Sequence, residues 1–368
     1  QLTGSGDLAL EITRGLPNNV TTEMDLALWE TAQTIRADTS ARQHMQNATP
    51  EELAVAYLRE KLPPPAQKAI WGFMKRYGMR GLGEIDLGRP RWREEPAYIM
   101  GILRSYLQID EQSLAPDALF ARAEIDAGTA ITQLESAARK TFGGVLKAKI
   151  IRAAARRVRA LAGLRETPKF HIVRMMGIIR QGLLQNGQAL VEAGVLEFPV
   201  DLFYLYLDEL EALAKDERRD WKSLIAARRA SYRREILRVQ IPRLLLSDGR
   251  VFFEADTSPG EESGILRGSP VSPGLVEGRV RVVLDPRHAD LIPGEILVCP
   301  ATDPAWTPLF LAASGLVMEV GGMMTHGAIV AREYGIPAVV GVNQATTRLE
   351  TGQCIRVNGS TGEIVLKD

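Results

Sequence analysis

Apolar residues recur at three- and four-residue spacings from Asn19 to Val239, and this period fits one buried face of an α-helix. This part of the chain is rich in Ala, Leu, Glu and Arg, which favour helices. We therefore expect this part of the chain to be mainly helical. The predicted helices are Thr22–Ala37, Pro50–Lys61, Ala66–Tyr77, Ala97–Leu107, Ala115–Arg165 with an interruption at Gly143-Gly144, Pro168–Ala193, Leu205–Lys215 and Asp220–Gln240.

One segment interrupts the helical pattern. Between Gly78 and Pro96 the chain carries four Gly, two Pro and alternating charges, which predicts a structured loop. A loop of this length inside a compact domain is uncommon and is often a functional element. A functional loop and a passive connection both remain open.

Beyond Arg243 the pattern changes to short β-branched runs separated by Gly and Pro, which is typical of strands. Asp256–Gly264 combines turn formers and acids, so it predicts an exposed linker. The predicted organisation is a helical domain at 1–255, a linker at 256–264 and a compact α/β domain at 265–368. The predicted strands are Gly278–Leu284, Glu295–Pro300, Gly315–Val320, Pro337–Val342, Cys354–Gly359 and Glu363–Leu366, with helices at Thr307–Ala313 and Gly327–Tyr334.

Length and composition narrow the class of protein. A chain of 368 residues is long enough for two domains, and hydrophobic and charged shares of 45% and 24% are those of a folded globular protein. Lys plus Arg and Asp plus Glu both total 45, so no net charge attracts a nucleic acid or an anionic membrane. Cys299 and Cys354 are far apart, which argues against a disulfide framework. With no membrane span or secretion signal apparent, a cytoplasmic location is expected.

A basic run between Arg139 and Arg159 could be taken for a nucleic-acid site. Apolar residues recur within it at helical spacing, so we expect a buried stripe with a charged outer face instead. The predicted stripe is Leu146, Ile150, Ala154, Val158 and Leu161.

The segment GGMMTHGAIVAREYGIPAVVG, from Gly321 to Gly341, carries the most specific chemistry. A strand ends in two glycines, Thr325 stands at a helix N-cap position, and His326 opens the helix. The positive end of a helix favours a phosphoryl group on the imidazole, and neutral imidazole is a competent nucleophile toward phosphorus. His326 is therefore either a phosphate carrier or a structural histidine. No ligand set for a metal lies on this helix, and His44, His171 and His288 are expected to be structural or surface residues.

This segment resembles the phosphohistidine motif in the mobile domain of phosphoenolpyruvate-utilising enzymes, as do Gly268–Val280 and Asp303–Phe310. In the helical half, Gly15–Trp29, Arg80–Pro96 and Arg165–Phe170 resemble the substrate-binding domain of rifampin phosphotransferases. The resemblance implies that an ATP-grasp domain binds ATP and Mg²⁺, that His326 takes up a phosphoryl group as a covalent phosphohistidine, and that it passes this group to a hydroxyl of a small, largely apolar acceptor such as a rifamycin. The products would be AMP, phosphate and the phosphorylated acceptor. Because no ATP-grasp domain precedes Gln1 in this sequence, we expect either a fragment or a chain that works with a separate ATP-binding partner.

The resemblance also suggests residues around the phosphohistidine. Arg165 and Lys169 are expected to hold the phosphoryl oxygens while Glu166 orients or deprotonates the acceptor hydroxyl; a solvated ion-pair cluster is the alternative. Thr325, Gly327 and Arg332 are the candidates for phosphate contacts on the carrier helix, although Arg332 could instead pair near Glu333. Weaker candidates for the acceptor pocket or docking surface are Glu84, Asp86, Arg91 and Trp92.

Two other functions remain open at this point. One is a phosphoenolpyruvate synthase-like activity on pyruvate, which the lack of a barrel domain after the mobile domain disfavours. The other is a ligand-binding module without catalysis, against which the intact GGMMTHG turn speaks.

Overall fold

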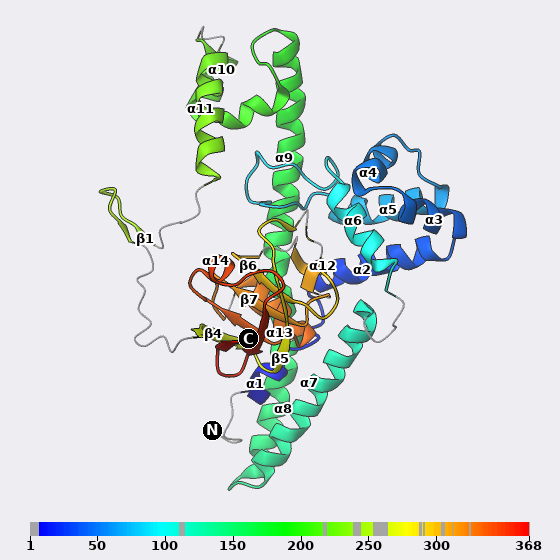
Figure 1. Cartoon of the computed structure of the whole chain (residues 1–368), viewed down its shortest axis with the longest axis vertical. Helices are drawn as coiled ribbons and strands as arrows, with labels where there is room; N and C mark the ends of the chain where they lie inside the picture. Colours follow the sequence, from blue (N-terminus) through cyan, green and yellow to red (C-terminus); the bar gives the residue numbers. More distant parts are fainter. Residues whose placement is uncertain are drawn as a thin grey trace. The chain divides into compact units, whose positions relative to one another are not determined.

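The computed structural model describes residues 7–109, 115–215, 219–237, 244–252, 264–286, 289, 291–302, 306–310, 312–323 and 325–367. The chain forms two compact units (Figure 1). Unit 1 combines Gln1–Gly78, Trp92–Phe170 and Ser258–Asp368, and unit 2 combines Met79–Arg91 and His171–Thr257. The N-terminal part is helical and the C-terminal part carries a mixed sheet, so the predicted fold class is confirmed. The domain limits 1–255, 256–264 and 265–368 stay a prediction, and 256–263 lie outside the described residues.

The predicted helices are present, with shifts at their ends. Thr49 caps its helix as expected: its side chain accepts a hydrogen bond from the Glu52 amide, and Glu52 accepts one from the Thr49 amide. The predicted helices are α2 (Val20–Arg36), α4 (Pro50–Leu58), α5 (Pro64–Tyr77), α6 (Ala97–Tyr106), α7 (Pro116–Arg139), α8 (Gly144–Ala162), α9 (Thr167–Glu192), α10 (Leu207–Ala214) and α11 (Trp221–Glu235). The sequence pattern missed α1 (Asp7–Glu11), α3 (Thr39–Asn47) and the 3₁₀ helices η2 (Gly163–Glu166) and η3 (Pro199–Tyr204).

The helical core of unit 1 lies where α2 packs against α5 and α6, and α4 against α6. Each of these helices presents one apolar face to the others, as the spacing predicts. The most deeply buried side chains are Leu28 and Ile35 of α2, Leu53 of α4, Ile70 of α5, and Ile99, Met100 and Leu103 of α6.

Helices α7 and α8 form a long antiparallel hairpin (Figure 1). They approach through small side chains, among them Ala127 on α7 and Ala148 and Ala155 on α8. The predicted buried stripe on α8 is therefore wrong: Leu146 is 66% exposed and Ile150 is 59% exposed, and the other members of the stripe also face solvent. The helical period was correct, but the face that packs against α7 is the alanine face.

The C-terminal part of unit 1 is built on an eight-stranded sheet with the strand order β3-β10-β9-β5-β6-β7-β8-β4. The four strands β5 to β8 run parallel, and the flanking strands are antiparallel. The strands are β3 (Ile265–Arg267), β4 (Ser269–Ser272), β5 (Leu275–Val282), β6 (Ile296–Cys299), β7 (Gly315–Met318), β8 (Ala338–Val340), β9 (Cys354–Asn358) and β10 (Glu363–Leu366). The pattern predicted six of these eight strands and missed the short β3 and β4.

The central strands are buried on both faces. All residues of β6, β7 and β8 are buried, which suits parallel strands covered by helices. The helices of this part are α12 (Thr307–Phe310), α13 (His326–Tyr334) and the unpredicted α14 (Ala345–Arg348). In parallel sheets, ligands usually bind at the carboxyl ends of the strands. The turn that leads from β7 into α13 lies at such an end.

Unit 2 has its own apolar cluster, formed by η3, α10, α11 and the neighbouring chain, with Leu202, Trp221 and Ile225 at its centre. A short hairpin of β1 (Leu244–Leu245) and β2 (Val251–Phe252) also belongs to it. The segment Met79–Arg91 is a structured loop, as predicted, because the Arg180 guanidinium donates to the Leu87 carbonyl at 2.7 Å. Among the helices in the described part of the chain, none is long and apolar enough to cross a bilayer.

Candidate functional site

His326 is the first residue of α13 and is half-buried. The chain reaches it from the carboxyl end of β7 through the turn at Gly321 and Gly322, as the sequence predicts. Met324 and residues 303–305 lie outside the described residues. The helix ends at Gly335, whose φ of 69° is in the left-handed region that favours glycine.

Thr325 occupies the predicted N-cap position and has extended backbone angles. Its hydroxyl donates to the Gly322 carbonyl at 2.8 Å and so braces the turn. Within the described residues it makes no capping hydrogen bond to the first turn of α13. The positive end of α13, which favours an anion, therefore receives no cap from the Thr325 side chain.

Gly327 lets the start of α13 approach the sheet closely. A Cβ atom here would lie 2.4 Å from Thr302 Oγ1 and 2.7 Å from Met318 Sδ, so a larger residue would push the helix away. The prediction made Gly327 a phosphate contact; the structure gives it a packing role next to His326.

Arg332 is 7% exposed and its Nη2 donates to the Met323 carbonyl at 2.5 Å, which ties α13 back to the turn before His326. Burial lowers the pKa of Arg332, and the positive charge of Arg165 lowers it further, while Glu333 opposes both. Two guanidinium groups thus repel each other beside the carrier helix. An anion placed between them would relieve this repulsion.

The predicted cluster Arg165, Glu166 and Lys169 spans η2 and the start of α9. Arg165 forms an ion pair with Glu166 at 3.6 Å. η2 packs tightly against the chain before α2, because a Cβ atom at Gly163 would lie 2.1 Å from the Pro17 carbonyl oxygen. Arg165 acts electrostatically on Arg332, and Glu166 on Glu333, so these two residues lie near α13. The roles expected of Arg165, Glu166 and Lys169 toward a phosphoryl group stay a prediction.

A set of buried polar contacts joins α13 to α2, and the sequence analysis did not identify it as part of the site. The Asn19 amide donates to one oxygen of Glu333 at 2.5 Å, and the Thr22 hydroxyl donates to the other at 2.6 Å. The Tyr334 hydroxyl donates to Asp25 at 2.8 Å. Asn19 also caps α2, which begins before the predicted start at Thr22. The available sequence clue was three polar residues at three-residue spacing, Asn19, Thr22 and Asp25, which precede the apolar Leu28 and Ile35 on the buried side of the helix.

Both carboxyl groups in this contact are strongly perturbed. Burial raises the pKa of Glu333 to about 7, against the effect of its hydrogen bonds from Thr22 and Asn19. Burial likewise raises the pKa of Asp25 to about 7. Such perturbed groups cluster at functional sites more often than elsewhere.

The weaker acceptor-site candidates fall in both units. In unit 2, Glu84 and Arg91 are 2% and 1% exposed: Glu84 pairs with Arg80 at 2.9 Å, and Arg91 donates to the Glu84 carbonyl at 2.8 Å. Asp86 in the same loop accepts from the Gly88 amide at 2.7 Å. These contacts give the three residues a role in holding the loop.

The fourth acceptor-site candidate, Trp92, belongs to unit 1 and is buried against Phe73 and Tyr98. Its side chain is thus part of an aromatic cluster in the helical core. A role for these four residues toward an acceptor stays a prediction.

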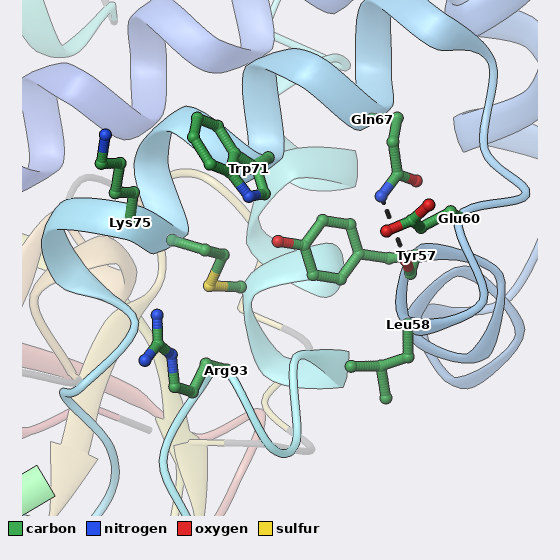
Figure 2. Close-up of a pocket in the computed structure, with 8 residues that line it drawn as sticks. Tyr57, Leu58, Glu60, Gln67, Trp71, Lys75 and Arg93 are labelled. Atoms are coloured by element: carbon green, nitrogen blue, oxygen red, sulfur yellow. Dashed lines mark hydrogen bonds between the residues drawn. The ribbon is translucent and has the colours of Figure 1, made fainter. Parts of the chain in front are cut away.

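A pocket of about 290 Å³ opens in the helical part of unit 1. Figure 2 shows the Tyr57 ring extending into it, with Trp71 on one side and Arg93 on another. Burial raises the pKa of Tyr57, partly offset by the charge of Arg93. The lining is mixed, with Glu60, Gln67 and Lys75 beside the apolar Leu58 and Met74.

Comparison with known proteins identifies both parts of the chain. Residues 1–166 match the rifampicin phosphotransferase fourth domain, and residues 291–362 match the mobile domain of PEP-utilising enzymes. The helical part of the chain is thus similar to rifampicin phosphotransferases, and its C-terminal part is similar to the mobile domain of PEP-utilising enzymes. The family resemblance inferred from the sequence motifs is thus confirmed.

Several curated relatives match nearly the whole chain. The rifampicin phosphotransferase of Streptomyces sviceus is 38% identical, over 98% of this chain and 41% of that protein. The rifampicin phosphotransferase of Bacillus subtilis is 35% identical over the same shares. A prodigiosin synthesizing transferase of Serratia marcescens is 25% identical over 100% of this chain and 41% of its own length. The chain thus spans about two fifths of the length of the curated relatives it matches.

Proposed function

We propose that this chain is the acceptor-binding and phosphocarrier portion of an ATP-dependent phosphotransferase, with His326 as the carrier. The observation that supports this most strongly is the position of His326. It opens α13 at a turn that Thr325 braces without capping the helix, and the positive charges of Arg332 and Arg165 act on each other nearby. A helix N-terminus and guanidinium groups nearby are features that favour a phosphoryl group.

The chemical step proposed for this chain is transfer from phosphohistidine to an alcohol. The N–P bond at His326 breaks and its electron pair returns to the ring, while a P–O bond forms to the acceptor oxygen. The acceptor proton passes to Glu166, and a proton on the second ring nitrogen lets the imidazole leave uncharged. Arg165 and Lys169 would stabilise the charge on the phosphoryl oxygens during transfer.

ATP and Mg²⁺ enter the proposal through an ATP-grasp domain, in the same parent polypeptide or in a separate chain. That domain would charge His326, with AMP and phosphate as the other products. The proposed acceptor is a hydroxylated, largely apolar small molecule. Rifampicin is the first compound to test, because four curated relatives of this chain carry its name.

The test uses the 368-residue chain alone. Phosphoramidate is a small phosphoryl donor that can phosphorylate histidine chemically, so it replaces the ATP-dependent step. Peptide mass spectrometry should find acid-labile phosphate on His326 in the wild type, and this signal should be lost in His326→Ala, while the exposed His44 and His171 are labelled equally in both proteins. Far-ultraviolet circular dichroism is the control for folding. Labelling of His44 and His171 without any phosphate on His326 in the wild type would refute the carrier role.

A second experiment separates the possible acceptors. The labelled chain is mixed with rifampicin or with pyruvate, and the product is followed by mass spectrometry. Phosphorylated rifampicin supports the proposal, and phosphoenolpyruvate from pyruvate would replace it with the synthase-like alternative. Labelling that passes to neither compound would refute rifampicin as the acceptor.

A further inference from the structure

Five polar side chains, four of them buried, join α13 to the helical part of unit 1. We call Asn19, Thr22, Asp25, Glu333 and Tyr334 the α2–α13 latch. Four of them are at most 3% exposed, so water cannot replace their mutual hydrogen bonds while the helices are in contact. Each side of the latch would be solvated if the helices separated.

The latch lies on the same face of α13 as His326. Glu333 follows His326 by seven residues, which is close to two full turns of an α-helix and about 10 Å along its axis. Anchoring Glu333 on α2 therefore also turns the His326 position toward the helical part of the unit. The electrostatic influence of Arg165 on Arg332 and of Glu166 on Glu333 places η2 beside the same helix.

We propose that the α2–α13 latch positions His326 for phosphoryl transfer to the acceptor, with Glu333 and Thr22 as its central positioning residues. This inference rests on the proposed carrier function. A slide of α13 by one turn moves it about 5.4 Å and would break every hydrogen bond of the latch. Because an unmatched buried polar group is costly, the latch selects one register, whereas an apolar contact would tolerate several. In-line transfer is sensitive to errors of about 1 Å, so fixing the register matters for the rate.

The chain offers matched variants for the test. Thr22→Val removes the hydroxyl that donates to Glu333 and keeps the shape of the side chain. Thr21→Val is its control, because Thr21 is equally buried and its hydroxyl has no hydrogen-bond partner in the described part of the chain. Glu333→Leu removes both acceptors, and Glu333→Gln retains the ability to pair with Asn19 and Thr22.

Each variant is phosphorylated with phosphoramidate, and single-turnover transfer to rifampicin is then timed. We expect Thr22→Val and Glu333→Leu to slow transfer about tenfold or more, since each loses a buried hydrogen bond to a carboxyl group. Labelling of His326 should stay at the wild-type level in all variants. Thr21→Val and Glu333→Gln should transfer within about twofold of the wild type. Equal transfer by the Thr22→Val and Thr21→Val variants, or labelling that falls together with transfer, would overturn the positioning role.

A distance measurement tests the latch even if the wild type transfers to no acceptor. Spin labels are placed on Cys354, which is exposed, and on Ser40→Cys in α3, while Cys299 is buried and does not react. The wild type should give one narrow distance distribution, and Thr22→Val and Glu333→Leu should broaden it. Failure of transfer with this broadening rejects the acceptor but supports the latch. Unchanged distributions in both variants reject the latch.

Discussion

Raising the pH from about 5.5 to about 8 should weaken the contact between α13 and α2. The main cause is Glu333, whose pKa burial raises from 4.5 to about 7. Hydrogen bonds from Thr22 and Asn19 oppose this rise. Of the charged groups that face Glu333, Glu166 raises its pKa further and Arg332 lowers it.

Asp25 also makes the contact between α13 and α2 weaker as the pH rises. Burial raises its pKa from 3.8 to about 7, while the hydroxyls of Tyr334 and Tyr106 lower it by hydrogen bonding. Both carboxyl groups therefore bind a proton more readily in the closed contact than in water. Closing the latch takes up protons in the range in which a solvated carboxylate would already be ionised.

This difference in pKa sets the sign and the size of the change in contact stability with pH. When α13 leaves α2, water reaches Glu333 and its pKa returns toward 4.5. The stabilisation from protonated Glu333 is complete below pH 4.5 and is lost as the pH rises to about 7, above which the contact no longer changes. Each pH unit in that window changes the free energy of closing by about 1.4 kcal/mol, or about 3 kcal/mol in total for Glu333. Between pH 5.5 and about 7 this amounts to about 2 kcal/mol, so the equilibrium constant for closing should fall on the order of 30-fold over the measured range.

The assay is the distance between spin labels at Cys354 and Ser40→Cys, measured on samples frozen at several pH values. The narrow population should shrink as the pH rises. Glu333→Gln should remove most of this dependence, and Glu333→Gln combined with Asp25→Asn should remove the rest. A wild-type distribution that is constant from about pH 5.5 to 8, or that sharpens as the pH rises, would refute the linkage.

Two further predictions concern stability. Gly163→Ala should lower the melting temperature by several degrees, because the new Cβ would lie 2.1 Å from the Pro17 carbonyl oxygen. The control Gly128→Ala, whose Cβ would have no atom within 4 Å, should leave the melting temperature unchanged or raise it slightly. Equal effects of the two variants would contradict the packing of η2. Leu146→Gln together with Ile150→Gln on α8 should change the free energy of unfolding by no more than about 1 kcal/mol, because both side chains are exposed. A urea titration measures this change. A loss of several kcal/mol would mean that this face of α8 is buried.

The sequence predicted the elements of this fold better than their contacts. Hydrophobic spacing located the long helices, and the Gly-Gly turn with Thr325 and Gly335 located both ends of α13. These features depend on local chemistry, which is visible in a few neighbouring residues. The apolar residues of α8 show the limit, because the same period allows either the Leu face or the Ala face to pack, and α7 selected the Ala face.

The site was predictable only where its chemistry is local. The proposed carrier His326 was predicted from its own motif, and Arg165 and Glu166 were predicted through the family resemblance. Thr22 was predicted only as the first residue of a helix, yet the structure uses it, together with Asp25, to hold α13. No sequence rule pairs them with Glu333 and Tyr334, which lie more than three hundred residues away. Buried partners of this kind become visible only when the tertiary contact is known.

The polar character of the latch suits a domain that has to leave its docking site. An apolar contact of similar size would expose a hydrophobic patch each time the carrier moved, which favours aggregation. A buried carboxyl group with two neutral donors adds little net stability, because its desolvation offsets most of the hydrogen-bond energy. It nevertheless penalises every wrong register, since a misplaced Glu333 would be buried without Asn19 and Thr22. The contact between α13 and α2 can therefore be specific in position and weak in affinity, and those are the two properties that a reversible phosphate carrier needs.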